Sequence, residues 1–117
     1  MYLLDTNVLS EVVRARPDAG VARRLGENPG STLFASAVTR YELRYGAALR
    51  DDDDGFWARI AGQIIPLVTW LAVTPAVAER AGKVAAGLRR AGRPCGSLDP
   101  LLAATTLEYG LTLVTRN

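Results

Sequence analysis

The chain opens with MYLLDTNVLS, residues 1–10, and this stretch decides which fold to expect. Residues 2–5 begin with a short apolar run, which is typical of a buried strand. Asn7 or Thr6 then stands where it could cap a turn of helix over residues 10–14. A strand that ends on Asp5 and leads at once into a helix indicates an α/β protein with that carboxylate at the rim of a sheet.

The same alternation continues along the chain. Residues 32–35 and 68–73 have the composition of strands, and residues 111–115 form a last one. Helices are predicted at 21–25, from the cap Ser36 to about residue 49, at 56–67, at 76–90 behind Pro75, and from Ser97 or Asp99 to Tyr109, where Gly110 ends the helix. Because parallel strands need helical crossovers, we expect an α/β sandwich with a mainly parallel sheet and a ligand site beyond the carboxyl ends of its strands.

Composition excludes several kinds of site. The 117 residues fit one domain, and 49% hydrophobic with 22% charged residues is typical of a folded protein. The sequence contains no histidine, which excludes Ser-His-Asp and Cys-His catalysis. The single cysteine, Cys95, excludes an intrachain disulfide and fits a reducing cytoplasm. The start of the chain does not read as a signal peptide, and Pro66 and Pro75 interrupt the most apolar stretch, so we expect a cytoplasmic protein without membrane association.

Two carboxylates stand at the starts of predicted helices. Asp5 directly follows an apolar strand, and Asp99 opens a helix that is apolar nearly all round, which implies burial of that helix. Each has an alternative, purely local role: Asp5 as a helix cap in competition with Asn7, and Asp99 as an N-cap followed by Pro100 at the first helical position. The residues alone leave both roles open.

Glu42 is the third carboxylate that its neighbours do not explain. Helical spacing puts an apolar stripe beside it, made of Val38, Tyr41, Tyr45, Ala48 and Leu49. No cation stands three or four positions away, so a salt bridge within the helix cannot account for Glu42. A glutamate that reaches from the core margin into solvent is the alternative.

Three carboxylates at one apolar margin would repel one another unless a cation neutralised them. Ligands that offer only oxygen favour Mg²⁺ or Mn²⁺ over zinc. Such a site suits phosphoryl transfer, because the cation stabilises charge on the phosphate oxygens.

Other polar and aromatic residues have simpler interpretations. The aspartate run 51–54 is expected to be a solvated loop whose last member caps the helix at Phe56, and Trp57 and Trp70, like Tyr41 and Tyr45, are expected in a core or an interface. The net charge is only +2, although the thirteen arginines far outnumber the single lysine. The following arginines are expected to be exposed and could follow a phosphate backbone: Arg14, Arg16, Arg23, Arg24, Arg89, Arg90 and Arg93.

Four segments, taken in order, resemble the PIN-domain toxins of VapBC toxin–antitoxin systems. They are LDTNVL at 4–9, SAVTRYEL at 36–43 with Gly46 behind it, LDPLLAAT at 98–105, and LVTRN at 113–117. The resemblance spans essentially the whole chain.

The resemblance implies a PIN-like three-layer α/β/α sandwich and a Mg²⁺- or Mn²⁺-dependent endoribonuclease. It implies that Asp5, Glu42 and Asp99 are the catalytic acids, that Asp5 and Asp99 bind the metal, and that Thr6, Asn7, Thr115 and Asn117 support them. It also implies homodimerisation and neutralisation by a VapB-type antitoxin. Cleavage by in-line attack of water would leave 5′-phosphate and 3′-hydroxyl ends on the RNA.

The chain departs from the family's pattern at Asn117. The family carries a fourth acid at this position or a few residues later, and usually a further strand. We therefore expect residues 1–117 to form a single PIN domain without the usual C-terminal edge strand, as a truncated chain or a degraded copy. A catalytically impaired copy that acts mainly by binding an antitoxin is the alternative function. A haloacid-dehalogenase-like phosphatase is disfavoured, because that family needs an aspartate where this chain has Asn7.

Overall fold

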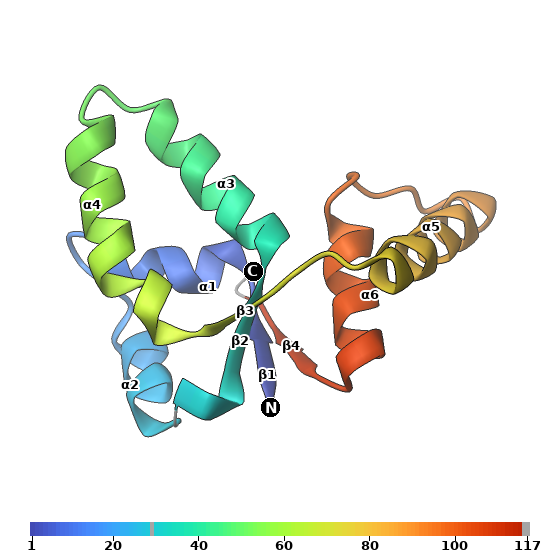
Figure 1. Ribbon diagram of the computed structural model, residues 1–117, viewed down its shortest axis with the longest axis horizontal. Coiled ribbons are helices and arrows are strands. Elements are labelled where there is room, and N and C mark those ends of the chain that lie inside the picture. Colours follow the sequence, from blue (N-terminus) through green and yellow to red (C-terminus); the bar gives the residue numbers. More distant parts are fainter. Residues whose placement is uncertain (29, 116–117) are drawn as a thin grey trace.

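The protein, described here by a computed structural model over residues 1–28 and 30–115, is built on a four-stranded sheet (Figure 1). The strands are β1 (Tyr2–Leu4), β2 (Leu33–Ser36), β3 (Thr69–Leu71) and β4 (Thr112–Val114). The α-helices are α1 (Thr6–Ser10), α2 (Ala19–Glu27), α3 (Ala37–Ala48), α4 (Asp53–Gln63), α5 (Pro75–Arg90) and α6 (Asp99–Tyr109). Three 3₁₀ turns complete the list: η1 (Glu11–Val13), η2 (Gly30–Thr32) and η3 (Ile65–Leu67).

All strand pairs are parallel, in the order β3-β2-β1-β4. The chain moves outward from β1 through β2 to β3, and then returns to place β4 on the other side of β1. The order therefore reverses between β1 and β4, which is where open α/β sheets place their ligands. The predicted parallel α/β sheet is confirmed.

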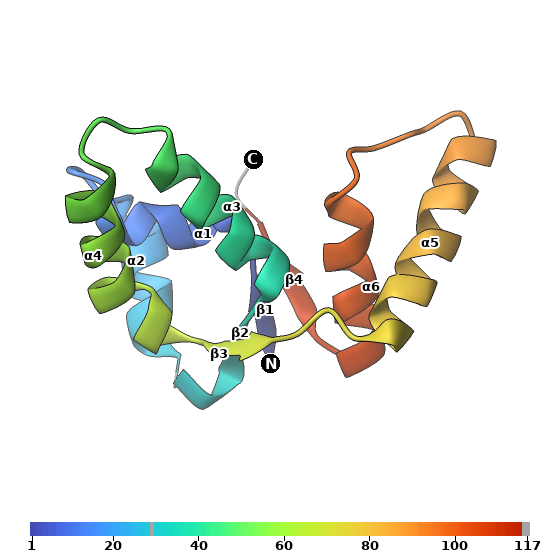
Figure 2. The ribbon, with the colours of Figure 1, turned by 45° about the horizontal axis from the view of Figure 1, so that its top comes forward.

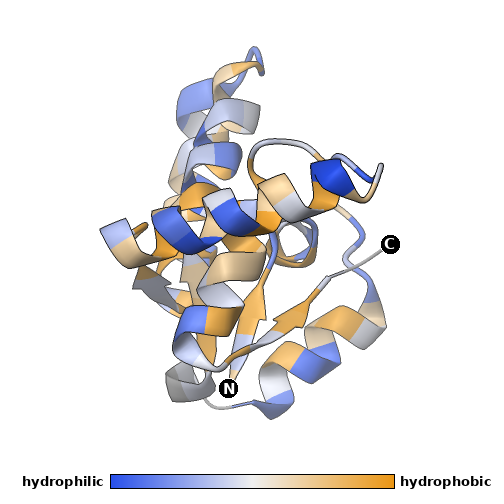
Figure 3. Cartoon of the chain, turned by 90° about the vertical axis from the view of Figure 1, so that its right-hand side faces the viewer, coloured by the Kyte–Doolittle hydropathy of each residue, from blue (hydrophilic) through white to orange (hydrophobic). Residues whose placement is uncertain are grey.

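Helices cover both faces of the sheet, which makes three layers (Figures 1 and 2). Leu4, Leu33 and Ala35 belong to one core cluster with α1, α3 and α4, whereas Leu3 and Phe34 belong to another with Leu102 of α6. This division follows the alternation of side chains along a strand. Figure 3 shows the strands as mainly hydrophobic, and the helices on the side that faces the viewer as mixed. Burial on both faces explains why the inner strands β1 and β2 read as nearly continuous apolar runs.

The segment after β1 folds into a helix earlier than predicted. Asp5, not Thr6 or Asn7, is the cap of α1, and its Oδ1 accepts a hydrogen bond from the Val8 N–H at 2.9 Å. The tighter turn η1 then occupies most of the range 10–14, where a helix was expected. A cap is most effective when its backbone is extended, and the strand that ends at Leu4 delivers Asp5 in that conformation.

Helices α2 and α4 begin or end at other residues than the sequence predicts. Asp18 caps α2 through the Val21 N–H at 3.0 Å, so this helix starts before residue 21. Helix α4 starts at Asp53 with Asp52 at its N-cap position, so the prediction that Asp54 caps it is wrong. Pro66 lies in η3, which separates α4 from the strand where a continuous helix to residue 67 was expected.

Helix α3 turns a different face to the core than expected. Its buried residues are Val38, Thr39, Leu43 and Ala47. Tyr41, Tyr45 and Leu49 are exposed by 55%, 59% and 70%, so the predicted apolar stripe points to solvent except at Val38. Small and aliphatic side chains allow α3 to approach α1 closely, which the large tyrosine rings would prevent.

Helix α6 ends as its sequence indicates. Gly110 adopts the left-handed conformation, with φ 64°, and turns the chain back into β4. The helix is only partly buried, however: Pro100, Leu102, Ala104 and Thr105 are covered, whereas Leu107 is exposed. In the part of the chain that the structure describes, no helix is both long and apolar enough to cross a membrane.

Candidate functional site at the carboxyl edge of the sheet

Asp5 lies at the carboxyl end of the inner strand β1. Its N–H donates to the Val114 carbonyl of β4 at 3.2 Å, which places Asp5 beside the end of the neighbouring strand. The bond from Val8 holds Oδ1, and among the described residues Oδ2 has no hydrogen-bond partner. The capping role therefore exists, and it leaves one oxygen of a half-buried carboxylate available at the switch point of the sheet.

Glu42 is half-buried on the flank of α3 and is tied to the same strand end. The Thr6 hydroxyl donates to Glu42 Oε1 at 2.7 Å. Ser36, the last residue of β2, starts α3 by accepting the Val38 N–H at 3.0 Å, so the helix leaves from the carboxyl edge of the sheet. The predicted position of Glu42 at the core margin is thus observed, and its partner is a hydroxyl from the segment that follows β1.

Asp99 is the first residue of α6, and the cap position is taken by Leu98, whose side chain makes no capping bond. The predicted Asp99–Pro100 cap pair is thus shifted by one position along the helix. Asp99 is exposed, and within the described ranges its side chain makes no hydrogen bond. Asp99 stands in the first turn of α6, where the helix dipole favours a negative charge, so its local role and a role in metal binding both stay open.

The topology brings the start of α6 to the same edge as Asp5. Because Gly110 turns α6 directly into β4, the two run in opposite directions, and the N-terminus of α6 lies on the side of the strand's carboxyl end (Figure 2). Eleven helical residues span about 16 Å at 1.5 Å each, whereas three strand residues span about 10 Å. Asp99 therefore stands beyond the end of β4, where Thr115 follows as an exposed residue.

The donor set at this edge suits a hard cation held by few protein ligands. Only carboxylate, hydroxyl and amide oxygens are offered, and Mg²⁺ is usually held by one or two carboxylates together with waters and substrate phosphates. Among the described residues, no three acidic or cysteine side chains gather closely enough to hold one ion together. The convergence of Asp5, Glu42 and Asp99 on one ion stays a prediction. The predicted supporting residue Asn117 lies outside the described residues, and Asn7 is exposed on α1.

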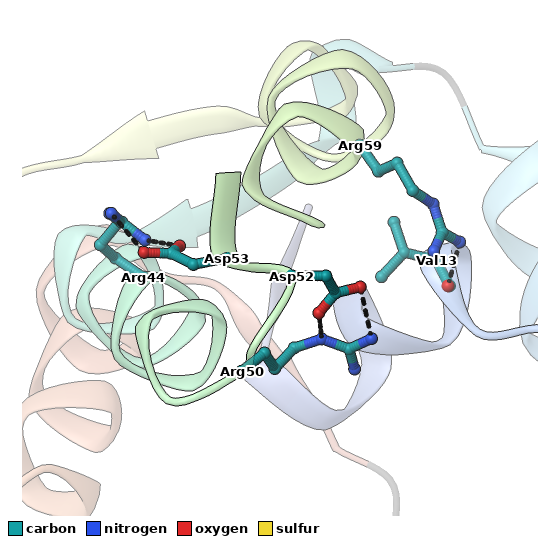
Figure 4. A network of polar contacts seen from close by, with 6 residues as sticks. All are labelled: Val13, Arg44, Arg50, Asp52, Asp53 and Arg59. Carbon is teal, nitrogen blue, oxygen red and sulfur yellow. Dashed lines mark hydrogen bonds and ion pairs between the residues drawn. The ribbon is translucent and has the colours of Figure 1, made fainter. Parts of the chain in front are cut away.

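The aspartate run after α3 does not form a second acidic site. Asp53 pairs with Arg44 at 2.6 Å and Asp52 with Arg50 at 2.7 Å (Figure 4). The hydrogen bond from Arg50 holds the pKa of the Asp52 carboxyl below its ordinary value, and the bond to Asp53 raises the pKa of the Arg44 guanidinium. These carboxylates hold the turn between α3 and α4.

The predicted core position is observed for the two tryptophans, whereas Tyr41 and Tyr45 are exposed and their place in an interface stays a prediction. Trp57 and Trp70 are half-buried against the larger core cluster. Guanidinium groups cover their outer faces, with Arg44 5.0 Å from the Trp57 ring and Arg40 5.2 Å from the Trp70 ring. Faces covered in this way are not open platforms for bases.

The sequence interpretation passed over Glu11, which is only 3% exposed. Glu11 accepts a hydrogen bond from Arg14 at 2.6 Å and another from the Asp18 N–H at 3.0 Å. Val8 and Val12, which flank Glu11 on the helical turn, were the sequence signal for its burial. Arg14, three positions after Glu11, instead indicated an ordinary ion pair at the surface.

The chain matches the family model of the PIN domain over residues 2–117. It is 32% identical to "VapC ribonuclease Y4jK" of Sinorhizobium fredii, over 100% of this chain and 87% of that relative. It is 34% identical to "tRNA(fMet)-specific endonuclease VapC" of Shigella flexneri, over 99% of this chain and 86% of that relative.

Solved structures agree with these sequence matches. The "Crystal Structure of FitAcB from Neisseria gonorrhoeae" superposes with a TM-score of 0.89 at 31% identity, covering 100% of this chain and 88% of that chain. The "Crystal structure of DNA bound VapBC from Salmonella typhimurium" gives a TM-score of 0.89 at 28% identity, covering 99% and 86%. The fold is thus shared with these solved relatives along nearly the whole chain.

Proposed function

The chain belongs to the PIN-domain family, and from that premise we propose that it is a metal-dependent endoribonuclease toxin of a toxin–antitoxin system. Whole-length similarity to relatives named as VapC ribonucleases supports the reaction class. The observation that carries the proposal for this chain is Asp5, a carboxylate with one oxygen available where the strand order reverses. Neither the fold nor the relatives favour the alternative of a catalytically impaired, antitoxin-binding copy.

Asp5 and Asp99 are the residues that would hold the metal ion, Mg²⁺ or Mn²⁺. When bound, such an ion supplies positive charge that stabilises the phosphate oxygens in the transition state. The bond from Val8 fixes the orientation of the Asp5 carboxylate in advance, so less rotamer freedom is lost on binding. The exposed Asp99 side chain can adjust from the opposite face of the sheet.

Glu42 would orient the attacking water and take its proton. The Thr6 hydroxyl occupies Glu42 Oε1 and holds the side chain in one position, which leaves Oε2 for the water. The water oxygen forms a bond to phosphorus as the bond from phosphorus to the 3′ oxygen breaks, and that oxygen leaves with a proton. The products are a 5′-phosphate and a 3′-hydroxyl.

RNA cleavage by the whole chain tests this function. We expect cleavage of a mixture of transfer, ribosomal and messenger RNA with Mg²⁺ or Mn²⁺ and none with EDTA. Asp5→Asn should lower the rate by about 100-fold or more, because an amide keeps the size of the side chain and loses its charge.

Glu79→Gln is the matched control, since Glu79 is exposed on α5 and makes no ion pair in the described part of the chain. It should cleave at the parent rate. Cleavage that survives EDTA, or that Asp5→Asn leaves at the parent rate, would contradict the proposed reaction.

Partners follow from the same family. A VapB-type antitoxin that covers the site is proposed because solved relatives at 28–29% identity are described as VapBC. A cytoplasmic location fits an RNA substrate and the free, exposed thiol of Cys95.

A homodimer is proposed through the exposed stripe of α3. The rings of Tyr41 and Tyr45 lie with their centroids 6.2 Å apart and their planes tilted by 31°, and Leu49 continues the stripe. Exposed aromatic clusters of this kind are typical of protein interfaces. Tyr45→Glu should sediment as a monomer where the parent chain sediments as a dimer, and a variant that stays dimeric would exclude this face.

A further inference from the structure

An arginine-rich groove lies beside the candidate site. It has a volume of about 1210 Å³ and runs between α1, η1, the loop that follows η1, and the first half of α4. Its lining includes Ser10 of α1 and Asn7, which follows Asp5 by two residues. Four of its lining residues are arginines: Arg14, Arg16, Arg50 and Arg59.

The two acids that line this groove, Glu11 and Asp18, accept hydrogen bonds from other residues of the protein. Glu11 is buried and binds both Arg14 and the Asp18 N–H. Asp18 in turn caps α2 through Val21. Neither carboxylate is therefore presented to the groove as an open negative charge that would repel an anion.

Two of the arginines make no ion pair with a carboxylate among the described residues, although Arg59 lies near enough to Asp52 to help lower the pKa of that carboxyl. Arg16 is exposed and makes no ion pair within the described ranges. Arg59 Nη2 donates to the Val13 carbonyl at 2.6 Å, a neutral acceptor that fixes the guanidinium and leaves its charge (Figure 4). The neighbouring Asp52 is already paired with Arg50.

Phe56 holds this side of the groove together. Its ring lies 3.9 Å from the Arg50 guanidinium and 5.8 Å from that of Arg59. Contact with the ring restricts both guanidinium groups. Arg50 already donates from Nε and Nη2 to Asp52, whereas in the described part of the chain Arg59 uses only Nη2, so Arg59 keeps further N–H groups for a ligand. Because the two guanidinium groups cover the Phe56 ring, a base cannot stack on it. The groove would therefore bind the backbone of a nucleic acid and not its bases.

We infer that this groove binds the ribose-phosphate backbone of single-stranded RNA and leads it to the candidate site, with Arg16 and Arg59 contacting phosphates. The inference rests on the proposed function, since the phosphodiester must reach Asp5. The guanidinium fork matches phosphate geometry, and continuity with Asn7 connects the groove to the carboxyl edge of the sheet. An acidic peptide is the competing occupant.

RNA binding at several salt concentrations tests the groove. In the Asp5→Asn background, which is expected to cleave far more slowly than the parent chain, a labelled single-stranded RNA is titrated by fluorescence anisotropy. Each of Arg16→Ala and Arg59→Gln should weaken binding several-fold and reduce the slope of log affinity against log salt by about 0.7. Lys83→Ala, which removes an exposed cation on α5 that makes no ion pair among the described residues, is the matched control and should change neither.

Kinetics separate positioning from folding. With Asp5 intact, Arg16→Ala should raise KM for a long RNA and leave kcat unchanged, because Arg16 touches the backbone away from the reacting phosphate. Arg16→Lys should recover most of the affinity. Because Arg16 is exposed, Arg16→Ala should unfold at the same Tm as the parent chain, and thermal unfolding checks that the fold is intact.

The outcomes are distinct. If the Arg16/Arg59 double variant binds RNA with the parent affinity and slope while the parent chain cleaves, the groove is refuted and the proposed function stands. If the double variant instead loses binding of a polyglutamate peptide and keeps RNA binding, the groove is a peptide site and the inference is overturned. A parent chain that neither binds nor cleaves RNA overturns the function and the groove together.

Discussion

The two faces of the sheet are built differently. On one face, α1, α3 and α4 share a core with β1, β2 and the segment before β3, and it includes fully buried Leu9, Ile60 and Ile64. On the other face, α6 contributes one buried leucine, Leu102, and then packs against the Ala- and Gly-rich α5. Because apolar burial drives folding, the first face contributes more stability than the second.

The candidate site combines one contribution from each face. Asp5 and Glu42 come from the first face and are each fixed by a hydrogen bond. Asp99 comes from the second face and stands free among the described residues. We therefore expect Asp5 and Glu42 to set the geometry of the proposed site and the Asp99 side chain to adjust when the cation and RNA bind.

The largest expected contrast is between core leucines on the two faces. Leu9→Ala should lower the free energy of unfolding by about 3–5 kcal/mol, since Leu9 is completely buried. Leu102→Ala should cost only about 2–3 kcal/mol, because the thinner second layer can relax around the cavity. Denaturant unfolding of both variants measures the difference. An equal or larger loss of stability for Leu102→Ala would contradict the claim that the first face contributes more stability than the second.

A smaller contrast concerns two glycines of the second face. Gly110→Ala should cost about 1–2 kcal/mol, since the turn from α6 into β4 needs a left-handed φ of 64° although no atom lies within 4 Å of the added Cβ. Gly82→Ala, inside α5 and equally open, should instead stabilise by about 0.5–1 kcal/mol. Thermal unfolding compares them. If both changed stability in the same direction, the turn would not be the constraint on this face.

The smallest effect concerns the ion pair that ties the turn before α4 on the first face. Because Arg50 lowers the pKa of Asp52 below its ordinary value of 3.8, the pair stabilises the fold above that pH and loses its effect as the pH falls through the lowered pKa. Asp52→Asn should therefore reduce Tm slightly at neutral pH and not at all in strong acid. Asp51→Asn, an exposed neighbour, is the control. A Tm difference that persists unchanged in strong acid would exclude this ion pair as its cause.

Much of the first face could be predicted from the sequence. The apolar strands and the cap Ser36 are local signals, and the structure uses each of them, as it uses the terminator Gly110 on the second face. The face of α3 could not be predicted, because Tyr41 and Tyr45 look as apolar as the true core residues Thr39 and Leu43. Which face of α3 is buried depends on the distance between α3 and α1, and the spacing of apolar residues in the sequence does not determine that distance.

The site was predictable to a similar extent. Strand ends identified Asp5, and the lack of a local partner identified Glu42. The Thr6–Glu42 bond joins residues 36 positions apart, and the arginine groove joins α1 with α4, so both depend on tertiary packing. For Asp99, a shift of one residue at the start of α6 removes the cap bond that the local sequence suggested.

Anomalous diffraction from crystals of the protein soaked in Mn²⁺ would locate the cation relative to the two faces. We expect one manganese peak at the carboxyl edge of the sheet, coordinated by Asp5 from the first face and Asp99 from the second, and lost in Asp5→Asn. Manganese bound elsewhere, or bound without either of these two carboxylates, would contradict a site shared between the two faces.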